Sequence, residues 1–166
     1  LVKQFEFKQV AGNKASLQRP VAIAEMSRPG FELAGFFQHS DFRRIVVFGE
    51  KEMAFIDQLD KATQKERFDR LTSDETPAII ICKNYKCPTI LKRIAKEKNF
   101  PILLTPRATG RMSIALSSYL DELLAPIVQM HGVFMNIYGK GVIIKGDSGI
   151  GKSEIALELI KRGHIL

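Results

Sequence analysis

Short apolar runs alternate with amphipathic segments along the first three quarters of the chain. Uninterrupted or nearly uninterrupted apolar runs occupy residues 45–48, 76–82 and 101–105. Runs of this length are typical of strands that are buried on both faces of a sheet. The segments between and after them predict helices over residues 50–59, 65–71, 89–99 and 109–124. Because strands alternate with helices, we expect a small α/β domain with a parallel sheet and helical crossovers.

The limits of this domain follow from its first and last elements. A weak alternation over residues 5–10 indicates the end of a strand. The helix over residues 109–124 is predicted to bury one side against the sheet. Proline cannot continue a helix and restricts the residue before it, so Ala125-Pro126 ends the helix and marks a boundary. We therefore predict one domain over residues 1–125 and the beginning of a second over residues 126–166. The expected buried side of the long helix consists of Met112, Leu116, Leu120, Leu123 and Leu124.

The start of the second domain is predicted to be an antiparallel hairpin. Two strand-like segments, residues 131–138 and 142–144, are separated by the glycine-containing triplet Gly139-Lys140-Gly141. A parallel connection needs about a dozen residues, and the triplet is too short for one. A three-residue turn fits an antiparallel pair. The Gly139-x-Gly141 spacing does not predict a dinucleotide site, because Ile144 occupies the position of the third glycine.

A glycine-rich loop follows the hairpin and matches the pattern G-x-x-x-x-G-K-S of phosphate-binding loops. An apolar strand precedes it and a helical segment, residues 154–162, follows it, which is the setting that the motif requires. Glycine lets such a loop turn tightly, so that its N–H groups and those of the helix can approach an anion. The predicted nucleotide-binding residues are Gly146, Asp147, Ser148, Gly149, Ile150, Gly151, Lys152 and Ser153.

Two side chains of the loop supply the rest of the expected chemistry. The ammonium group of Lys152 can reach the β- and γ-phosphates of ATP, and the hydroxyl of Ser153 can bind Mg²⁺. The alternative is a glycine-rich turn with an exposed lysine and no ligand. The helix that follows is predicted to end at Gly163. Its expected apolar face consists of Ile155, Ala156, Leu159 and Ile160.

Composition and charge exclude several classes of protein. The net charge of +7 arises from 25 basic and 18 acidic residues that are spread along the 166-residue chain. The densest basic segment, residues 92–98, contains Glu97 and has an apolar side, which is typical of a solvated helix face. We therefore expect no nucleic-acid partner, although a basic surface would attract an acidic protein.

The sequence contains no apolar run long enough to span a membrane and no signal-peptide pattern, so a cytoplasmic protein without a membrane partner is expected. Cys82 and Cys87 form a C-x₄-C pair without a second pair, and they are predicted to be free thiols rather than metal ligands.

Four stretches of the chain carry a family resemblance. They are Ser27-Arg28-Pro29-Gly30 with Glu32 and Ala34-Gly35, residues 76–80, His131-Gly132-Val133, and the run from Tyr138 through the loop to His164. On these residues the chain resembles the HPr kinase/phosphorylase family over essentially its whole length. The resemblance implies an N-terminal α/β domain similar to one in Mur-type cell-wall ligases, and a kinase domain similar to phosphoenolpyruvate carboxykinase. It implies transfer of phosphate from ATP or pyrophosphate to a serine of the phosphocarrier protein HPr, its reversal by inorganic phosphate, and a homo-hexamer.

The same resemblance assigns roles to individual residues. His131 and Lys152 are the implied catalytic residues, with His131 contacting phosphate or handling a proton. Without the family, a strand-end histidine with a purely structural hydrogen bond is the alternative. Family members carry an aspartate pair shortly after the position of Leu166, so residues 1–166 alone are expected to show little or no kinase activity. Measured phosphate transfer to HPr by these residues alone would contradict that expectation.

Two other functions remain open at this point. One is a regulatory or oligomerisation module that binds nucleotide without catalysis. The other is an unrelated P-loop NTPase, which would need a parallel strand beside the loop and a residue that orients water; the predicted hairpin argues against it.

Overall fold

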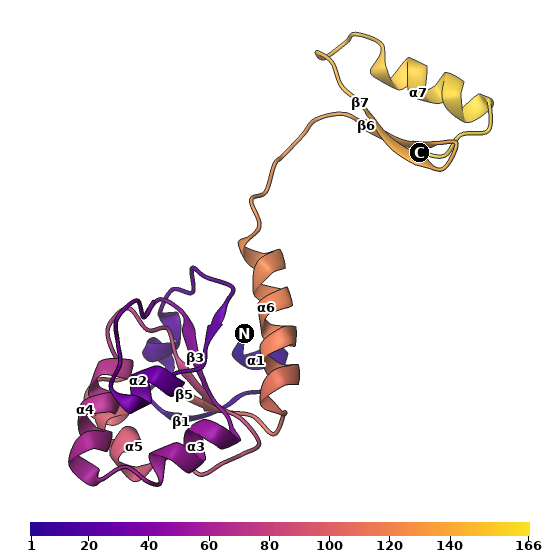
Figure 1. Ribbon diagram of the computed structural model, residues 1–166. Helices are drawn as coiled ribbons and strands as arrows, with labels where there is room; N and C mark the ends of the chain where they lie inside the picture. The colour runs from indigo at the N-terminus through magenta and orange to yellow at the C-terminus, as the bar shows by residue number, and fades with distance from the viewer. The chain divides into compact units, whose positions relative to one another are not determined.

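A five-stranded sheet lies at the centre of the first part of the chain (Figure 1). Neighbouring strands follow the order β1-β5-β4-β3-β2, and β2 to β5 run parallel to one another. The predicted parallel α/β sheet is therefore confirmed. At one edge of the sheet, β1 runs antiparallel to β5, and the sequence did not predict this direction. The strands are β1 (Lys8–Ala11), β2 (Met26–Ser27), β3 (Ile45–Phe48), β4 (Ile79–Ile81) and β5 (Ile102–Leu104).

The computed structural model describes all residues from 1 to 166, and it divides into the units Leu1–Ala125 and Pro126–Leu166. The first unit contains the five-stranded sheet, one 3₁₀ helix, η1 (Lys14–Gln18), and six α-helices. These are α1 (Val2–Phe5), α2 (Gly30–Ala34), α3 (Glu50–Ile56), α4 (Lys61–Leu71), α5 (Thr89–Glu97) and α6 (Thr109–Leu124).

Each face of the sheet has its own hydrophobic core, because successive side chains of a strand point to opposite faces. Val46 and Phe48 of β3 pack among residues of α2, α3, α4 and α5. Ile45 and Val47 of the same strand pack on the other face, which α6 covers. The helices that connect the parallel strands thus lie on one face, and the last helix lies on the other (Figure 1).

Several predicted helix limits are wrong by a few residues, and capping explains one of them. α4 begins at Lys61 rather than at residue 65, because the carboxylate of Asp60 accepts hydrogen bonds from the N–H groups of Ala62 and Thr63 at 2.9 and 3.0 Å. The limits of α6 are as predicted, but its buried stripe ends at Leu120. Leu123 and Leu124 are exposed, so the last turn of α6 is not packed on the sheet.

An ion pair between a half-exposed arginine and a buried glutamate fixes the start of α3. The Nη2 group of Arg28 donates to both carboxylate oxygens of Glu52, at 2.9 and 3.0 Å. The N–H of Gly49 donates to the same carboxylate at 2.9 Å. Burial raises the pKa of Glu52, but these hydrogen bonds outweigh burial and leave the pKa below its ordinary value of 4.5. Arg28 therefore ties the end of β2 to the helix that follows β3.

Replacing Glu52 by glutamine is expected to destabilise the first unit at neutral pH, because Arg28 loses its charged partner. A carboxylate with a lowered pKa in the folded state stabilises the fold above about pH 4.5, and this contribution is lost as the pH falls through the lowered pKa. The Glu52→Gln variant should therefore lose less stability than the parent between about pH 5 and pH 3. Urea unfolding at several pH values measures this. The exposed Glu97→Gln variant serves as a control, and an identical pH profile for Glu52→Gln and the parent would contradict the prediction.

The second unit contains one hairpin and one helix. Its strands β6 (Val133–Ile137) and β7 (Lys140–Ile144) pair antiparallel, which confirms the predicted hairpin. The predicted three-residue turn is wrong. The turn consists of Tyr138 and Gly139, which have φ angles of 51° and 80°, as in the two-residue turns that suit the twist of a hairpin. Gly141 belongs to β7, and a Cβ atom there would lie 2.9 Å from the ring of Phe134 on β6.

The chain returns to the hairpin after α7 (Lys152–Lys161). Asn136 and Ile165 form an antiparallel bridge, with N···O distances of 2.7 and 3.2 Å. Met135 and Ala156 are the buried apolar residues of this unit. Ile155 and Ile160, which were expected to share the apolar face of α7 with Ala156, are exposed. None of the helices in either unit combines the length and the apolar character needed to cross a membrane.

Candidate phosphate-binding site

The glycine-rich loop connects β7 directly to α7 (Figure 1). The strand–loop–helix arrangement is the one expected from the sequence, although α7 begins at Lys152, two residues earlier than predicted. The helix therefore includes Lys152 and Ser153 in its first turn. The position of both side chains is set by helical backbone geometry rather than by an irregular loop.

The structure explains why glycine occupies each of the three glycine positions of the motif. Gly149 and Gly151 have φ angles of 82° and 91°, a region that disfavours other residues. At Gly146 the reason is space, because a Cβ atom would lie 2.9 Å from Cγ2 of Ile150. The loop backbone consequently depends on all three positions. Larger residues would strain the backbone at Gly149 and Gly151, and at Gly146 they would require the Ile150 side chain to move.

The ammonium group of Lys152 lies across the loop. Its Nζ donates to the carbonyl oxygens of Gly146 and Asp147, at 2.8 and 2.5 Å. These two bonds draw the beginning and the end of the motif together around one positive charge. A phosphate group that reached this ammonium would therefore also meet the backbone of the loop.

The first turn of α7 offers further donors. Gly151 caps the helix without a side-chain acceptor, and the first N–H that bonds within the helix is that of Ile155, to the oxygen of Gly151 at 3.0 Å. The preceding N–H groups have no acceptor within the helix. Asp147, Ser148, Ile150 and Ser153 are exposed, so the loop is accessible. The unpaired N–H groups at the start of α7 and the ammonium group of Lys152 are close together, and both favour binding of an anion.

His131 lies at the end of the hairpin from which the loop departs. The register pairs Val133 with Ile144, the last residue of β7, and His131 precedes Val133 by two residues. Gly132 lies so close to β7 that a Cβ atom would be 2.8 Å from the oxygen of Ile144. The exposed His131 side chain is therefore carried next to the start of the loop. Its contact with a phosphate stays a prediction.

The protein side chains around the loop do not form a metal-binding cluster. No group of three or more histidine, cysteine, aspartate and glutamate side chains is arranged to hold a metal ion. The hydroxyl of Ser153 is the protein oxygen predicted to bind Mg²⁺. A magnesium ion here would take its other ligands from phosphate oxygens and water, which is common for this ion.

The sequence did not predict two structural features of this site. The contacts of Lys152 with two backbone carbonyls have no signature in the sequence. The close approach of Gly132 to β7 could have been inferred, since a glycine inside a strand pattern often marks such an approach.

These features define an α/β protein in which an antiparallel hairpin carries a loop of phosphate-binding sequence. The chain belongs to the HPr serine kinase family. The family model described as the HPr serine kinase N terminus matches residues 1–120, and the HPr serine kinase C-terminal domain matches residues 122–166.

Curated relatives agree with this assignment. Proteins named HPr kinase/phosphorylase from Bacillus cereus (strain B4264), Bacillus mycoides (strain KBAB4) and Bacillus anthracis (strain A0248) are each 42% identical to this chain over 166 residues. The similarity covers 100% of this chain and 53% of each relative. The chain thus spans about half the length of the curated relatives that it matches.

Proposed function

We propose that this chain carries the nucleotide-binding part of an HPr kinase/phosphorylase. The complete protein would transfer phosphate from ATP or pyrophosphate to a serine of HPr and would reverse the reaction with inorganic phosphate. The observation that supports this most directly is the position of Lys152, held by Gly146 and Asp147 at the start of a helix with free N–H groups. The 42% identity over the whole chain to proteins of that name supports the choice of substrate.

The residues of the loop have separate tasks in this proposal. Backbone N–H groups of residues 146–153 hold the β- and γ-phosphates, and Lys152 balances the charge of the transferred group. Ser153 orients Mg²⁺, and His131 contacts phosphate or moves a proton. Bound ATP supplies the phosphoryl group, and Mg²⁺ neutralises its charge.

These 166 residues are proposed to bind nucleotide without transferring phosphate. Transfer to a serine hydroxyl requires a base. Asp147 lies within the loop itself, and Glu154 and Glu158 lie on α7, with Glu158 engaged by Lys161 and Arg162. None of these three carboxylates is proposed as the base. We also propose, from the family resemblance, a homo-hexamer and a cytoplasmic location, with no nucleic-acid partner.

Calorimetric titration of the 166-residue chain with ATP and Mg²⁺ tests the nucleotide site. Saturable binding is expected, and a parallel assay with HPr should show no phosphoserine. Absence of binding at millimolar ATP would refute the nucleotide site. Transfer to HPr would instead refute the assignment of these residues as only part of the catalytic centre.

Replacing Ser153 by alanine should weaken binding of ATP in the presence of Mg²⁺ and leave binding in EDTA nearly unchanged, because the hydroxyl is proposed to contact the metal and not the phosphate. We expect a loss of about tenfold, the usual range for one contact to a charged group. Ser118→Ala, the same change at an exposed position of α6, is the control and should bind ATP like the parent. Equal losses with and without Mg²⁺ would contradict the role of Ser153.

A further inference from the structure

An exposed aromatic pair lies on α2 and just after it. Phe31, near the start of the helix, is 77% exposed, and Phe36, just after its end, is 52% exposed. The two rings meet edge to face, with their centroids 6.4 Å apart. A buried aromatic side chain contributes about 150–250 Å² of contact area, more than most other residues. The pair therefore leaves an apolar area that the first unit itself does not cover.

An arginine of α4 stacks on the next aromatic ring of the chain. The guanidinium carbon of Arg70 lies 3.6 Å from the centre of the Phe37 ring, and that of Arg67 lies 5.9 Å from it. Gly35 lets α4 approach the end of α2, because a Cβ atom there would lie 2.6 Å from Nη2 of Arg67. Phe36 lies between Gly35 and Phe37 in the chain, so the stacked arginine is close to the exposed pair.

The guanidinium group of Arg70 has no partner of opposite charge, although it stacks on a ring. Stacking restrains the guanidinium, so binding to it costs less side-chain entropy. Its planar fork of donors is therefore available for a carboxylate in bidentate geometry. The carboxylates of α2 and α4 are all engaged elsewhere, in the pairs Glu32 with Ser40, Glu66 with Arg67 and Asp69 with Lys98.

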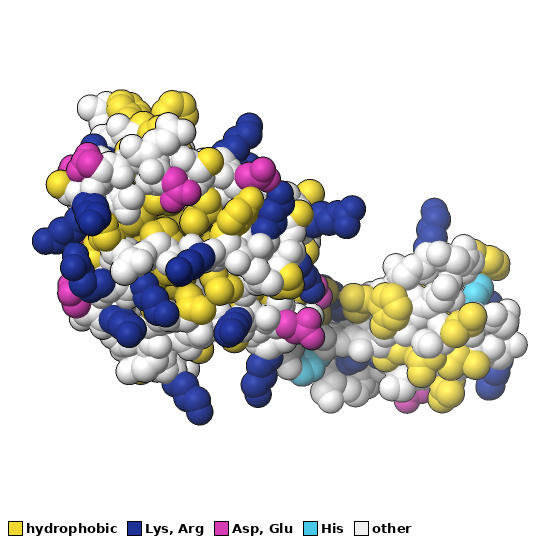
Figure 2. All heavy atoms as spheres, turned by 90° about the horizontal axis from the view of Figure 1, so that it is seen from below, with side chains coloured by type: hydrophobic (Ala, Val, Ile, Leu, Met, Phe, Trp, Pro, Cys, Tyr) yellow, Lys and Arg dark blue, Asp and Glu magenta, His cyan; other side chains and the backbone are white.

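We infer that these residues form a docking surface for an acidic, amphipathic segment of another protein. An apolar side chain of that segment covers the exposed aromatic pair, and one of its carboxylates binds Arg70. Aromatic residues and arginine are enriched among the side chains that dominate binding at protein interfaces. On the face of the first unit seen in Figure 2, basic side chains (dark blue) outnumber acidic ones (magenta), which favours the approach of an acidic partner. The surface, called the α2 surface below, consists of Phe31, Phe36, Phe37 and Arg70.

Two other occupants match the α2 surface less well. A second copy of the chain, placed symmetrically on the same surface, would bring no free carboxylate to Arg70, because those of α2 and α4 are engaged. An anionic membrane would meet the exposed carboxylates of Glu66 and Asp69 beside the arginine, and like charges repel. A partner that carries its own carboxylate avoids both difficulties.

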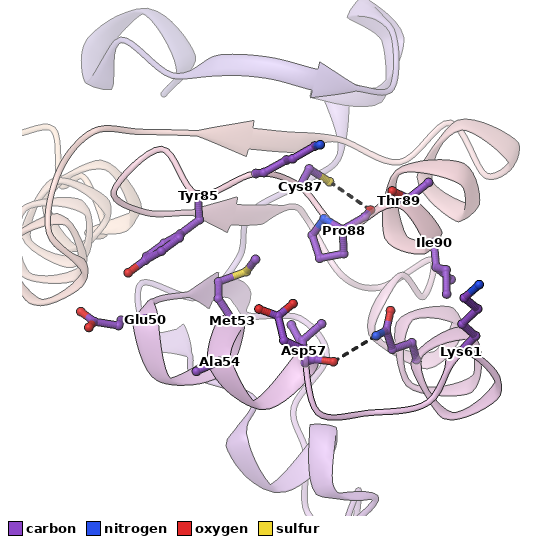
Figure 3. Close-up of a pocket in the computed structure, with 13 residues that line it drawn as sticks. Glu50, Met53, Ala54, Asp57, Lys61, Tyr85, Cys87, Pro88, Thr89 and Ile90 are labelled. Carbon is purple, nitrogen blue, oxygen red and sulfur yellow. Dashed lines mark hydrogen bonds between the residues drawn. The ribbon is translucent and has the colours of Figure 1, made fainter.

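A cavity elsewhere in the first unit, beside Tyr85, lacks this free positive charge. It has a volume of about 570 Å³ and lies between α3, the beginning of α4 and the segment over residues 85–90 (Figure 3). It therefore serves as an internal reference for the specificity of docking. The charged residues that line it have both signs and are Glu50, Asp57, Lys61 and Lys86.

Titration of the ¹⁵N-labelled 166-residue chain with two matched synthetic helical peptides tests the inference. Both peptides carry leucine and phenylalanine on one face, and the other face carries glutamate in one peptide and lysine in the other. With the glutamate peptide, saturable amide shifts are expected at residues 31–37 and 67–70 and not at residues 85–90. Binding of the lysine peptide should be about tenfold weaker, because it cannot form the charged contact with Arg70.

Three variants separate the two parts of the α2 surface. Arg70→Ala should weaken binding of the glutamate peptide by about tenfold and remove the difference between the peptides. Phe31→Ala should weaken binding of both peptides by about tenfold, because it removes apolar contact area. Arg111→Ala changes an exposed arginine of α6, on the other face of the sheet, and should bind both peptides like the parent.

Several results would overturn the inference. One is the absence of saturable shifts at millimolar glutamate peptide, and another is an equal loss for Arg70→Ala and Arg111→Ala. Shifts at residues 31–37 that grow with the concentration of the chain alone would show a second copy as the occupant. Binding to phosphatidylserine vesicles that is lost in Phe31→Ala would show a membrane as the occupant.

Discussion

Replacing Lys152 by alanine is expected to weaken binding of ATP with Mg²⁺ by about tenfold to a hundredfold. The variant loses the charge that faces the phosphates, and a hydrogen bond to a charged group contributes about 1.5–3 kcal/mol. It also loses the two bonds that draw Gly146 and Asp147 together, so the loop should be less ordered before nucleotide binds. Calorimetric titration gives the affinity, and circular dichroism shows whether the fold is retained.

A lysine at the other end of the same helix provides the control. Lys161 lies in the last turn of α7, and its contact with Glu158 is a weak surface ion pair of 3.8 Å. Lys161→Ala should bind ATP like the parent. If Lys152→Ala also binds like the parent, the ammonium does not reach the phosphates, and the proposed site is wrong.

Replacing Phe48 by alanine is expected to destabilise the first unit by about 3–5 kcal/mol, the usual cost of removing a buried phenyl ring. Phe48 is 0% exposed in β3, an interior strand of the sheet, and its ring packs 6.4 Å from that of Phe68 on α4, measured between centroids. The cavity that the substitution leaves would lie between the sheet and the connecting helices. Urea unfolding followed by circular dichroism measures the loss.

Phe31 offers the same chemical change at the surface. It is 77% exposed on α2 and touches Phe36. Phe31→Ala should change stability by less than about 0.5 kcal/mol. A loss of similar size in both variants would show that β3 is not the centre of the core.

Hydrophobic periodicity was sufficient to predict three of the parallel strands of the first unit and the helices that follow them. The apolar run over residues 45–48 could only be a buried strand, and the structure places all four residues out of solvent. The limits of α4 were not predictable from periodicity, because Asp60 sets its start by a local hydrogen bond. The direction of β1 was not predictable either. The sequence of a four-residue edge strand does not indicate whether it pairs parallel or antiparallel with the next strand.

The glycine-rich loop was predictable because its chemistry depends on residue types at fixed spacing. Gly149 and Gly151 have the positive φ angles that the motif implies. The pocket beside Tyr85 was not predictable, because its walls come from segments that are distant in the sequence and meet only through the parallel sheet. The likeness to Mur-type ligases and to phosphoenolpyruvate carboxykinase stays a prediction.

The antiparallel bridge between Asn136 and Ile165 fixes the direction in which the backbone runs after α7. A strand that continued from this bridge would run antiparallel to β6 and parallel to β7, and would come level with Val133 three residues beyond Ile165. Val133 is the end of the hairpin at which the loop begins. Side chains that followed such a strand would therefore lie at the same end of the hairpin as His131 and the start of the glycine-rich loop.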